Sequence, residues 1–180
     1  MDKRDQIINA AIELFAEQGF DKTSISAICE KVGVSKGLVF HHFKNKDDLL
    51  REVFIKITDI VRNAGERSPA ITDPKARIVA YIESIFAAMS VPDYRVLYQL
   101  NFSVMVQPNT RALLLDLIEE RVLFMRQATE EVFDYIGHKN SAIVSQMFVA
   151  EIDGIALNYL FSAEEFPIDE IKTEFIKKYT

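Results

Sequence analysis

The sequence is short of cysteine, of long apolar runs and of strand patterns, and each shortage excludes a class of protein. One cysteine among 180 residues cannot form an internal disulfide framework. The longest apolar runs fall well short of the roughly 18 residues that span a bilayer, and the N-terminal stretch carries acidic residues and no signal-peptide cleavage site. Strand-like alternation and internal repeats are absent as well. We therefore expect an all-helical protein of the reducing cytoplasm without membrane contact.

The residue combinations of common enzyme and metal sites are also missing. The sequence holds no nucleophile with a base and an orienting partner, and no glycine-rich phosphate loop. Asp153 and His138 form no constellation with other reactive groups. His41 and His42 are adjacent, but adjacent residues on a helix point about 100° apart, and no Cys or carboxylate stands beside them at ligand spacing. We therefore predict no catalytic residue, no metal site and no cofactor.

The stretch TSISAICEKVGVSKGLVFHHFKNK, residues 23–46, has the pattern of two short helices around a tight turn. Apolar residues at positions 25, 28 and 32 share one face of a helix of about two turns. Gly33 suits the left-handed residue that ends a helix, and Ser35 is a suitable N-cap for the next one. That second helix, near residues 36–43, is expected to bury Val39 and Phe43. The layout is typical of a helix-turn-helix DNA-binding motif, although a packing corner in any helical protein would share its first half.

A wider segment closely resembles the DNA-binding region of the TetR/AcrR family of transcriptional regulators. From Gln6 to about Val53 it reproduces a helix ending in F-x-x-x-G-[FY], then T-[ST]-[IV]-x-x-I, then a stretch similar to AGVS-x-G-x-[FY]-x-[HY]-F-x-[SN]-K-x-x-L. Two positions depart from the family pattern. Cys29 replaces a usual alanine and is expected to be a buried core thiol. Phe40 stands where tyrosine is frequent, so it can pack against sugar but cannot donate to a phosphate.

The resemblance implies an all-α, nine-helix TetR-type fold in two domains. Residues 1–62 would form the helix-turn-helix DNA-binding domain, whose fourth helix links it to the rest, and residues 63–180 would form a ligand-binding and dimerisation domain. Breakers at residues 65–74 (GERSPAITDP) and at Gly137 separate the later helices. We expect those helices near residues 74–89, 94–106, 108–136, 141–161 and 167–179.

The candidate DNA-binding residues lie in and beside the motif. Lys36, in the first turn of the second helix, can reach the O6 or N7 acceptors of guanine. Gly37 lets the backbone approach DNA, Leu38 can touch a thymine methyl group, His41 faces the groove or its edge, and His42 faces a flanking phosphate. Serine hydroxyls near the motif are further candidates, and the resemblance assigns Lys46 to a phosphate. The predicted DNA-binding residues are Ser24, Ser26, Ser35, Lys36, Gly37, Leu38, Phe40, His41, His42 and Lys46.

The charge of this segment predicts a modest electrostatic contribution to DNA binding. The whole chain has a formal net charge of −6, but residues 1–50 hold seven Lys and Arg against eight Asp and Glu, a net of −1. The excess acid therefore lies outside the motif. With so few cations the salt dependence should be shallow, and hydroxyls and helix N-termini would supply part of the phosphate contacts.

The second domain carries predictions of a dimer and of a ligand pocket. In the family the last two helices pair with their copies, and here the segment from Ser141 is apolar around most of its circumference, with Gly154 and Ala156 permitting close approach. We therefore predict a homodimer through these helices. The resemblance also implies a ligand pocket among helices four to eight, although aromatic residues at helical spacing are most often core. Its candidate lining is Phe86, Met89, Tyr94, Tyr98, Phe102, Met105, Phe124 and Phe148.

Together these features predict a bacterial, sequence-specific DNA-binding transcriptional regulator. In its most specific form the hypothesis is a homodimeric repressor that binds a palindromic operator in double-stranded DNA and releases it when a small apolar or aromatic ligand binds. Two alternatives have less support. A TetR-fold small-molecule carrier or sensor that does not read DNA would have no use for Lys36 and Lys46, and a helical enzyme would need the catalytic residues that the sequence lacks.

Overall fold

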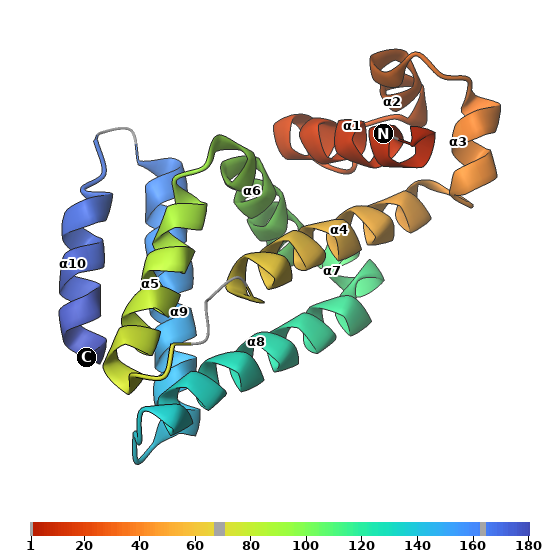
Figure 1. Ribbon diagram of the computed structural model, residues 1–180. Coiled ribbons are helices and arrows are strands. Elements are labelled where there is room, and N and C mark those ends of the chain that lie inside the picture. The colour runs from red at the N-terminus through yellow and green to blue at the C-terminus, as the bar shows by residue number, and fades with distance from the viewer. Residues whose placement is uncertain (1, 67–70, 163–164) are drawn as a thin grey trace. The chain divides into compact units, whose positions relative to one another are not determined.

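The structure is a computed structural model that describes residues 2–66, 71–162 and 165–180. Helices are the only regular secondary structure among these residues, besides the turns and loops that join them, which confirms the predicted all-α class (Figure 1). Among the described residues, no helix combines the length and the apolar character that a membrane span needs. The ten helices of the described residues are Lys3–Gln18 (α1), Ile25–Val32 (α2), Lys36–His42 (α3), Lys46–Glu66 (α4), Pro74–Met89 (α5), Pro92–Val106 (α6), Pro108–Leu113 (α7), Leu115–Tyr135 (α8), Ser141–Phe161 (α9) and Ile168–Tyr179 (α10).

A difference from the predicted nine helices lies near residue 114. The sequence predicts one long helix between Pro108 and Gly137, whereas the structure has a short α7 and a separate α8 on either side of Leu114. Leu114 has φ −116° and ψ 7°, and its side chain is fully buried. The interruption therefore accompanies the burial of a leucine, and since neither Gly nor Pro marks the position, the local pattern does not signal it.

Two predicted helix boundaries in the later part of the chain are confirmed. Asp73 Oδ2 accepts a hydrogen bond from the backbone N–H of Ala76 at 2.7 Å, and Pro74 stands in the first turn of α5. Gly137 follows α8 with φ 78°, a conformation that glycine adopts without a Cβ penalty. Of the breaker segment at residues 65–74, residues 67–70 lie outside the described residues.

Contacts within the chain group its residues into two compact units. Unit 1 contains Met1–Ile60 and Val96–Ile118, and unit 2 contains Val61–Arg95 and Glu119–Thr180. In unit 1, buried side chains of α1 to α4 form one core with residues between Leu97 and Ile118. The helix-turn-helix segment therefore shares its core with a stretch far along the chain. The boundary predicted between residues 62 and 63 separates a DNA-binding domain from a ligand-binding and dimerisation domain. This division by function stays a prediction.

Unit 2 has an aromatic core centred on Phe148 of α9. This ring is 1% exposed. Its centroid lies 5.0–5.8 Å from those of Tyr81 on α5, Phe133 on α8, and Phe175 and Tyr179 on α10. One side chain thus packs against rings from three other helices of unit 2.

Candidate nucleic-acid interface

The turn between α2 and α3 has the geometry that the sequence predicts. Gly33 ends α2 in the left-handed conformation, with φ 70° and ψ 45°, and the backbone N–H of Val34 donates to the carbonyl of Cys29 at 3.0 Å. Each helix begins with a capping serine, whose Oγ accepts from the backbone N–H three residues on, at 3.1 Å for Ser24 and 3.2 Å for Ser35. These bonds fix the turn within a few residues.

The inner faces of these helices are buried, as expected. Ile28 and Val39 have no exposed surface, and Phe43 is almost completely covered. Cys29 is buried with a free thiol, which confirms its prediction as a core group. Thr23 Oγ1 donates to two carbonyls at the end of α1, at 3.1 and 2.8 Å. The core therefore holds α3 by its inner face.

The outer face of α3 is open to solvent. Phe40 is 51% exposed, and Lys36 takes part in none of the ion pairs found among the described residues. An exposed cation and an exposed ring on the second helix of the motif are suited to contact with a DNA groove. Of the predicted DNA-binding residues, Ser24, Ser26, Ser35, Lys36, Gly37, Phe40 and His41 are exposed, and Leu38, His42 and Lys46 are half-buried.

Gly37 is not required by the packing of the chain itself. A Cβ atom built at this position would meet only Ser35 Oγ, at 3.8 Å, and Gly37 is not among the described glycines with positive φ. Neither the backbone nor a neighbouring group therefore needs a glycine here. The missing side chain leaves room for an external partner to approach the backbone closely at this point.

Lys46 lies at the start of α4, and its ammonium group is directed into the protein. Lys46 Nζ donates to the carbonyls of Phe20 at 2.9 Å, Thr23 at 3.2 Å and Asp21 at 3.4 Å. It also lies 4.3 Å from the centroid of the Phe20 ring. Lys46 thus ties α4 to the loop between α1 and α2. Its predicted contact with a DNA phosphate stays a prediction, and the structure adds this internal role.

The substitution Lys46→Met should lower the free energy of unfolding of the DNA-free protein by about 1–2 kcal/mol, because charged hydrogen bonds to three carbonyls are lost. Denaturant unfolding followed by circular dichroism would measure it. Lys44→Met is the matched control, since it removes the same charge from an exposed position nearby. Equal stability of the two variants would contradict the internal role of Lys46.

The structure also contains a contact that the sequence analysis does not predict. Arg51 of α4 donates from Nη1 to Asp116 Oδ1 at 2.8 Å and from Nη2 to Asp116 Oδ2 at 2.6 Å, and Nη1 also donates to the carbonyl of Leu113 at 2.8 Å. We call this set of bonds the Arg51 clamp. The partners Arg51 and Asp116 are 65 residues apart, so no local pattern relates them.

The Arg51 clamp stays charged over the physiological range. Hydrogen bonding from Arg51 lowers the pKa of Asp116 from 3.8 to about 2. A carboxylate whose folded pKa is depressed contributes stability above its unfolded pKa and loses it as the pH falls through the folded value. The contribution is therefore complete above about pH 4 and is lost between about pH 4 and pH 2.

The predicted ligand-pocket residues are divided between the two units. Tyr98, Phe102 and Met105 belong to unit 1, Phe86, Met89, Phe124 and Phe148 belong to unit 2, and the side chain of Tyr94 lies outside the described part of the chain. Phe86 and Phe148 are buried and pack on Phe175, with centroids 5.7 and 5.1 Å away. Phe124 is 37% exposed, and the Arg62 guanidinium lies 4.6 Å from its ring centroid. The ligand role of these residues stays a prediction.

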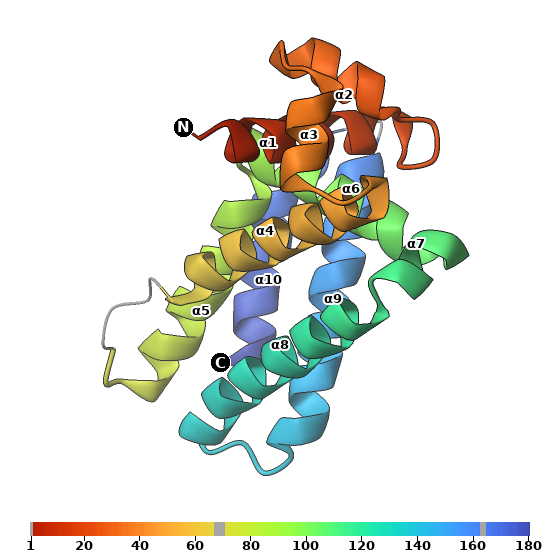
Figure 2. The same cartoon turned by 90° about the vertical axis from the view of Figure 1, so that its right-hand side faces the viewer.

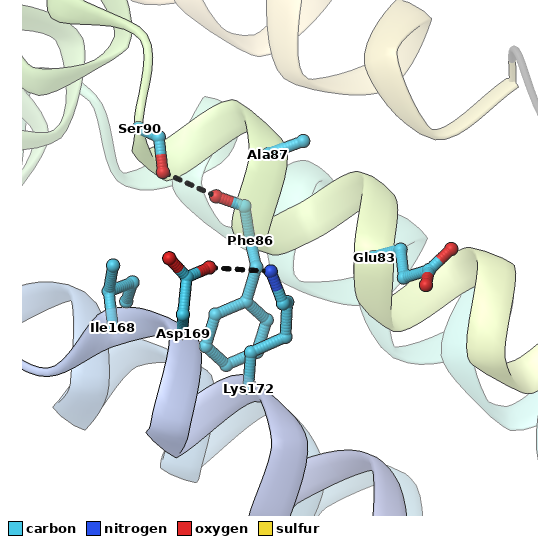
Figure 3. A pocket seen from close by; sticks show the side chains of 7 residues that line it. All are labelled: Glu83, Phe86, Ala87, Ser90, Ile168, Asp169 and Lys172. Carbon is cyan, nitrogen blue, oxygen red and sulfur yellow. Dashed lines mark hydrogen bonds and ion pairs between the residues drawn. The ribbon is translucent and has the colours of Figure 1, made fainter.

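A small pocket lies between α5 and α10 in unit 2 (Figure 3). Its volume of about 230 Å³ is below the roughly 300–1,000 Å³ typical of ligand sites. Lys172 Nζ donates to Asp169 Oδ1 at 2.7 Å, and Ser90 Oγ donates to the carbonyl of Phe86 at 3.2 Å. These polar groups have partners within the chain, so we do not regard the pocket as the predicted ligand site. Its lining is Glu83, Phe86, Ala87, Ser90, Ile168, Asp169 and Lys172.

Comparison with known proteins finds similarity to bacterial regulators. Residues 7–53 match the sequence profile of the bacterial regulatory proteins of the tetR family. The HTH-type transcriptional regulator BetI of Proteus mirabilis is 30% identical over 176 residues, which cover 94% of this chain and 86% of that protein.

Two solved structures have the same fold at 19% sequence identity. A transcriptional regulator from Rhodococcus sp. Rha1 matches with a TM-score of 0.84 over 98% of this chain and 93% of that chain. A proposed transcriptional regulator from Saccharomonospora viridis, in complex with choline, matches with a TM-score of 0.76 over 97% of this chain and 93% of that chain. These two structures show the shared fold, and the BetI match together with the tetR-family profile shows that the chain belongs to the TetR family of transcriptional regulators, which bind DNA through the helix-turn-helix and are not enzymes.

Proposed function

We propose that the protein is a homodimeric repressor that binds a palindromic operator and releases it when a small molecule binds. The observation that carries the DNA-reading role is the outer face of α3, where Lys36, Gly37 and Phe40 are exposed on a helix held by its buried inner face. A recognition helix presented in this way contacts base edges with its N-terminal residues. Lys36 and Gly37 are the first two residues of α3.

A second copy of the chain is the proposed partner of α9. One face of α9 is buried in unit 2 and includes Phe148 and Ile152, and the opposite face carries a row of outward-facing apolar or small residues. Phe161 is 68% exposed and Ile143 is 59% exposed. Large apolar side chains in one exposed row mark an interaction surface. We call this row the α9 stripe, and it consists of Ile143, Met147, Ala150, Gly154, Leu157 and Phe161.

The spacing of the α9 stripe favours another helix as its cover. Its members alternate by four and three residues, which keeps them on one side of a helix and suits packing against a second helix. A two-fold axis would place the α9 stripe of one copy against that of the other. Dimerisation would also double every phosphate contact, which matters for a segment of net charge −1.

Release by a ligand is proposed to work as a population shift. A ligand that binds better to a conformation unable to fit the operator lowers the DNA affinity by that difference in binding. The aromatic residues predicted to line the pocket favour a small apolar or aromatic ligand. Choline is the first compound to test, because the S. viridis protein of the same fold binds it and aromatic faces attract quaternary ammonium groups.

Lys36→Ala should weaken operator binding by at least about tenfold, because each half-site loses one contact to a base edge. The operator is first sought in the DNA upstream of the gene, and then in a random-sequence pool, at moderate salt with excess random competitor. Affinity is measured by fluorescence anisotropy with a labelled duplex.

Lys139→Ala is the charge-matched control, since Lys139 is exposed in the loop before α9 and far from α3 in the sequence. Equal operator affinity of the two variants would contradict the role of Lys36. If the unaltered protein binds no sequence selectively in either search, the repressor proposal fails, and the small-molecule carrier becomes the better account.

A further inference from the structure

We propose that Arg51 is a positioning residue for DNA recognition, because it holds the first half of α4 against the beginning of α8 and so fixes the direction of the recognition helix α3. This inference rests on the proposed binding of two half-sites by a dimer. It goes beyond the contacts of α3 itself, since Arg51 lies in another helix and acts through it.

The joint between α3 and α4 is tight enough to transmit the direction of one helix to the other. The backbone N–H of Asp48 donates to Asn45 Oδ1 at 2.7 Å, and Asp48 Oδ2 accepts from the backbone N–H of Lys44 at 2.9 Å. This reciprocal cap closes the short connection between the helices. Phe43 at the end of α3 and Leu49 in α4 are buried in the same core. A rotation of α4 would therefore carry α3 with it.

The Arg51 clamp sits little more than a turn beyond this joint. Figures 1 and 2 show α7 and the start of α8 beside the first half of α4. Leu114 and Ile118 are buried in the core that α4 also lines. The clamp adds a directional contact to this apolar packing, because two parallel N–H···O bonds to one carboxylate set the angle between the groups as well as their distance.

The clamp also lies on a helix that continues into unit 2. The first turn of α8 belongs to unit 1, and α8 from Glu119 onward belongs to unit 2, where it contributes Phe133 to the aromatic core. A change in the first turn of α8, within unit 1, would therefore reach α4 through Arg51.

The energetics separate positioning from simple stabilisation. The side chains of Arg51 and Asp116 are 35% and 65% exposed, and exposed ion pairs contribute little to stability. Operator affinity depends more strongly than stability on the direction of α3, because two recognition helices must enter successive major grooves about 34 Å apart. Loss of the clamp should therefore change operator affinity much more than thermal stability.

The experiment compares operator and random DNA for the full-length variants Arg51→Ala and Asp116→Asn. We expect each to bind the operator at least about tenfold more weakly than the unaltered protein. Affinity for random DNA should stay within about twofold, and the melting temperature should change little. Arg111→Ala is the charge-matched control, since Arg111 is exposed on α7 and takes part in none of the ion pairs of the described residues.

Exchanging the charges of Arg51 and Asp116 provides the decisive test. Arg51→Asp combined with Asp116→Arg keeps the net charge and restores an ion pair, so it should regain operator affinity lost by Arg51→Asp alone. If Arg51→Ala and Arg111→Ala bind the operator with equal affinity, the inference is overturned. It is also overturned if the charge exchange restores no operator affinity. An unaltered protein that selects no operator would instead refute the proposed function, so the two failures are distinguishable.

Discussion

Replacing Met147 with glutamate is expected to give a monomer that binds the operator more than about 100-fold more weakly than the unaltered protein, because linked half-sites gain roughly that factor from simultaneous engagement. Met147 is 51% exposed and is the second residue of the α9 stripe. In a symmetric dimer the substitution places two carboxylates in one apolar interface, where each loses water without gaining a partner. Size-exclusion chromatography with light scattering would report the mass, and anisotropy the affinity.

Two variants control for charge and for side-chain identity. Gln127→Glu adds the same charge at an exposed position of α8, outside the proposed interface, and should remain dimeric. Met147→Leu keeps an apolar side chain of similar volume and should do the same. A folded Met147→Glu protein that still has the mass of a dimer would refute the proposed interface.

The features that could be predicted from the sequence are those decided by neighbouring residues. The left-handed conformation of Gly33, the cap by Ser35 and the burial of Val39 depend on backbone geometry and on side chains within one or two turns. The exposure of Gly37 and His41 follows from the same periodicity, since both lie away from Val39 and Phe43, whereas Lys36 is exposed as the first residue of α3. The candidate DNA-reading face could therefore be placed before its surroundings were known.

Features that depend on distant residues could not be found in the same way. Lys46 has the charge and the position of a phosphate-binding lysine, yet its ammonium group contacts carbonyls more than 20 residues earlier in the chain. Arg51 meets a carboxylate on another helix. Both outcomes depend on which helices pack together, and neither a lysine nor an arginine signals its partner in the sequence.

Aromatic residues of unit 2 present a related difficulty. The sequence suggests Phe86 and Phe148 for a ligand pocket, and the structure places both against Phe175 in the core of unit 2. Helical spacing does not distinguish a ring that fills a core from a ring that lines a cavity, because both lie on an inward face. The distinction requires the volume left between the helices, which the sequence does not contain.

The substitution Phe148→Ala should lower the free energy of unfolding by about 3–5 kcal/mol, the range for truncating a buried phenylalanine. Tyr81 and Tyr179 would each lose a partner whose ring centroid now lies 5.8 or 5.0 Å away. The cavity would open among four helices, so the neighbouring rings cannot all relax into it. Denaturant unfolding at a fixed protomer concentration would measure the change, since dimerisation makes apparent stability depend on concentration.

Phe40→Ala is the matched control, because it removes the same ring from a position that is 51% exposed on α3. Its unfolding free energy should stay within about 0.5 kcal/mol of the unaltered value. The unfolding free energy of Phe148→Leu should lie between those of Phe148→Ala and Phe40→Ala, since leucine keeps part of the buried volume. A loss of stability at Phe148 no greater than that at Phe40 would show that the ring cluster does not hold α5, α8, α9 and α10 together, and the support that this core gives to the α9 stripe would be lost with it.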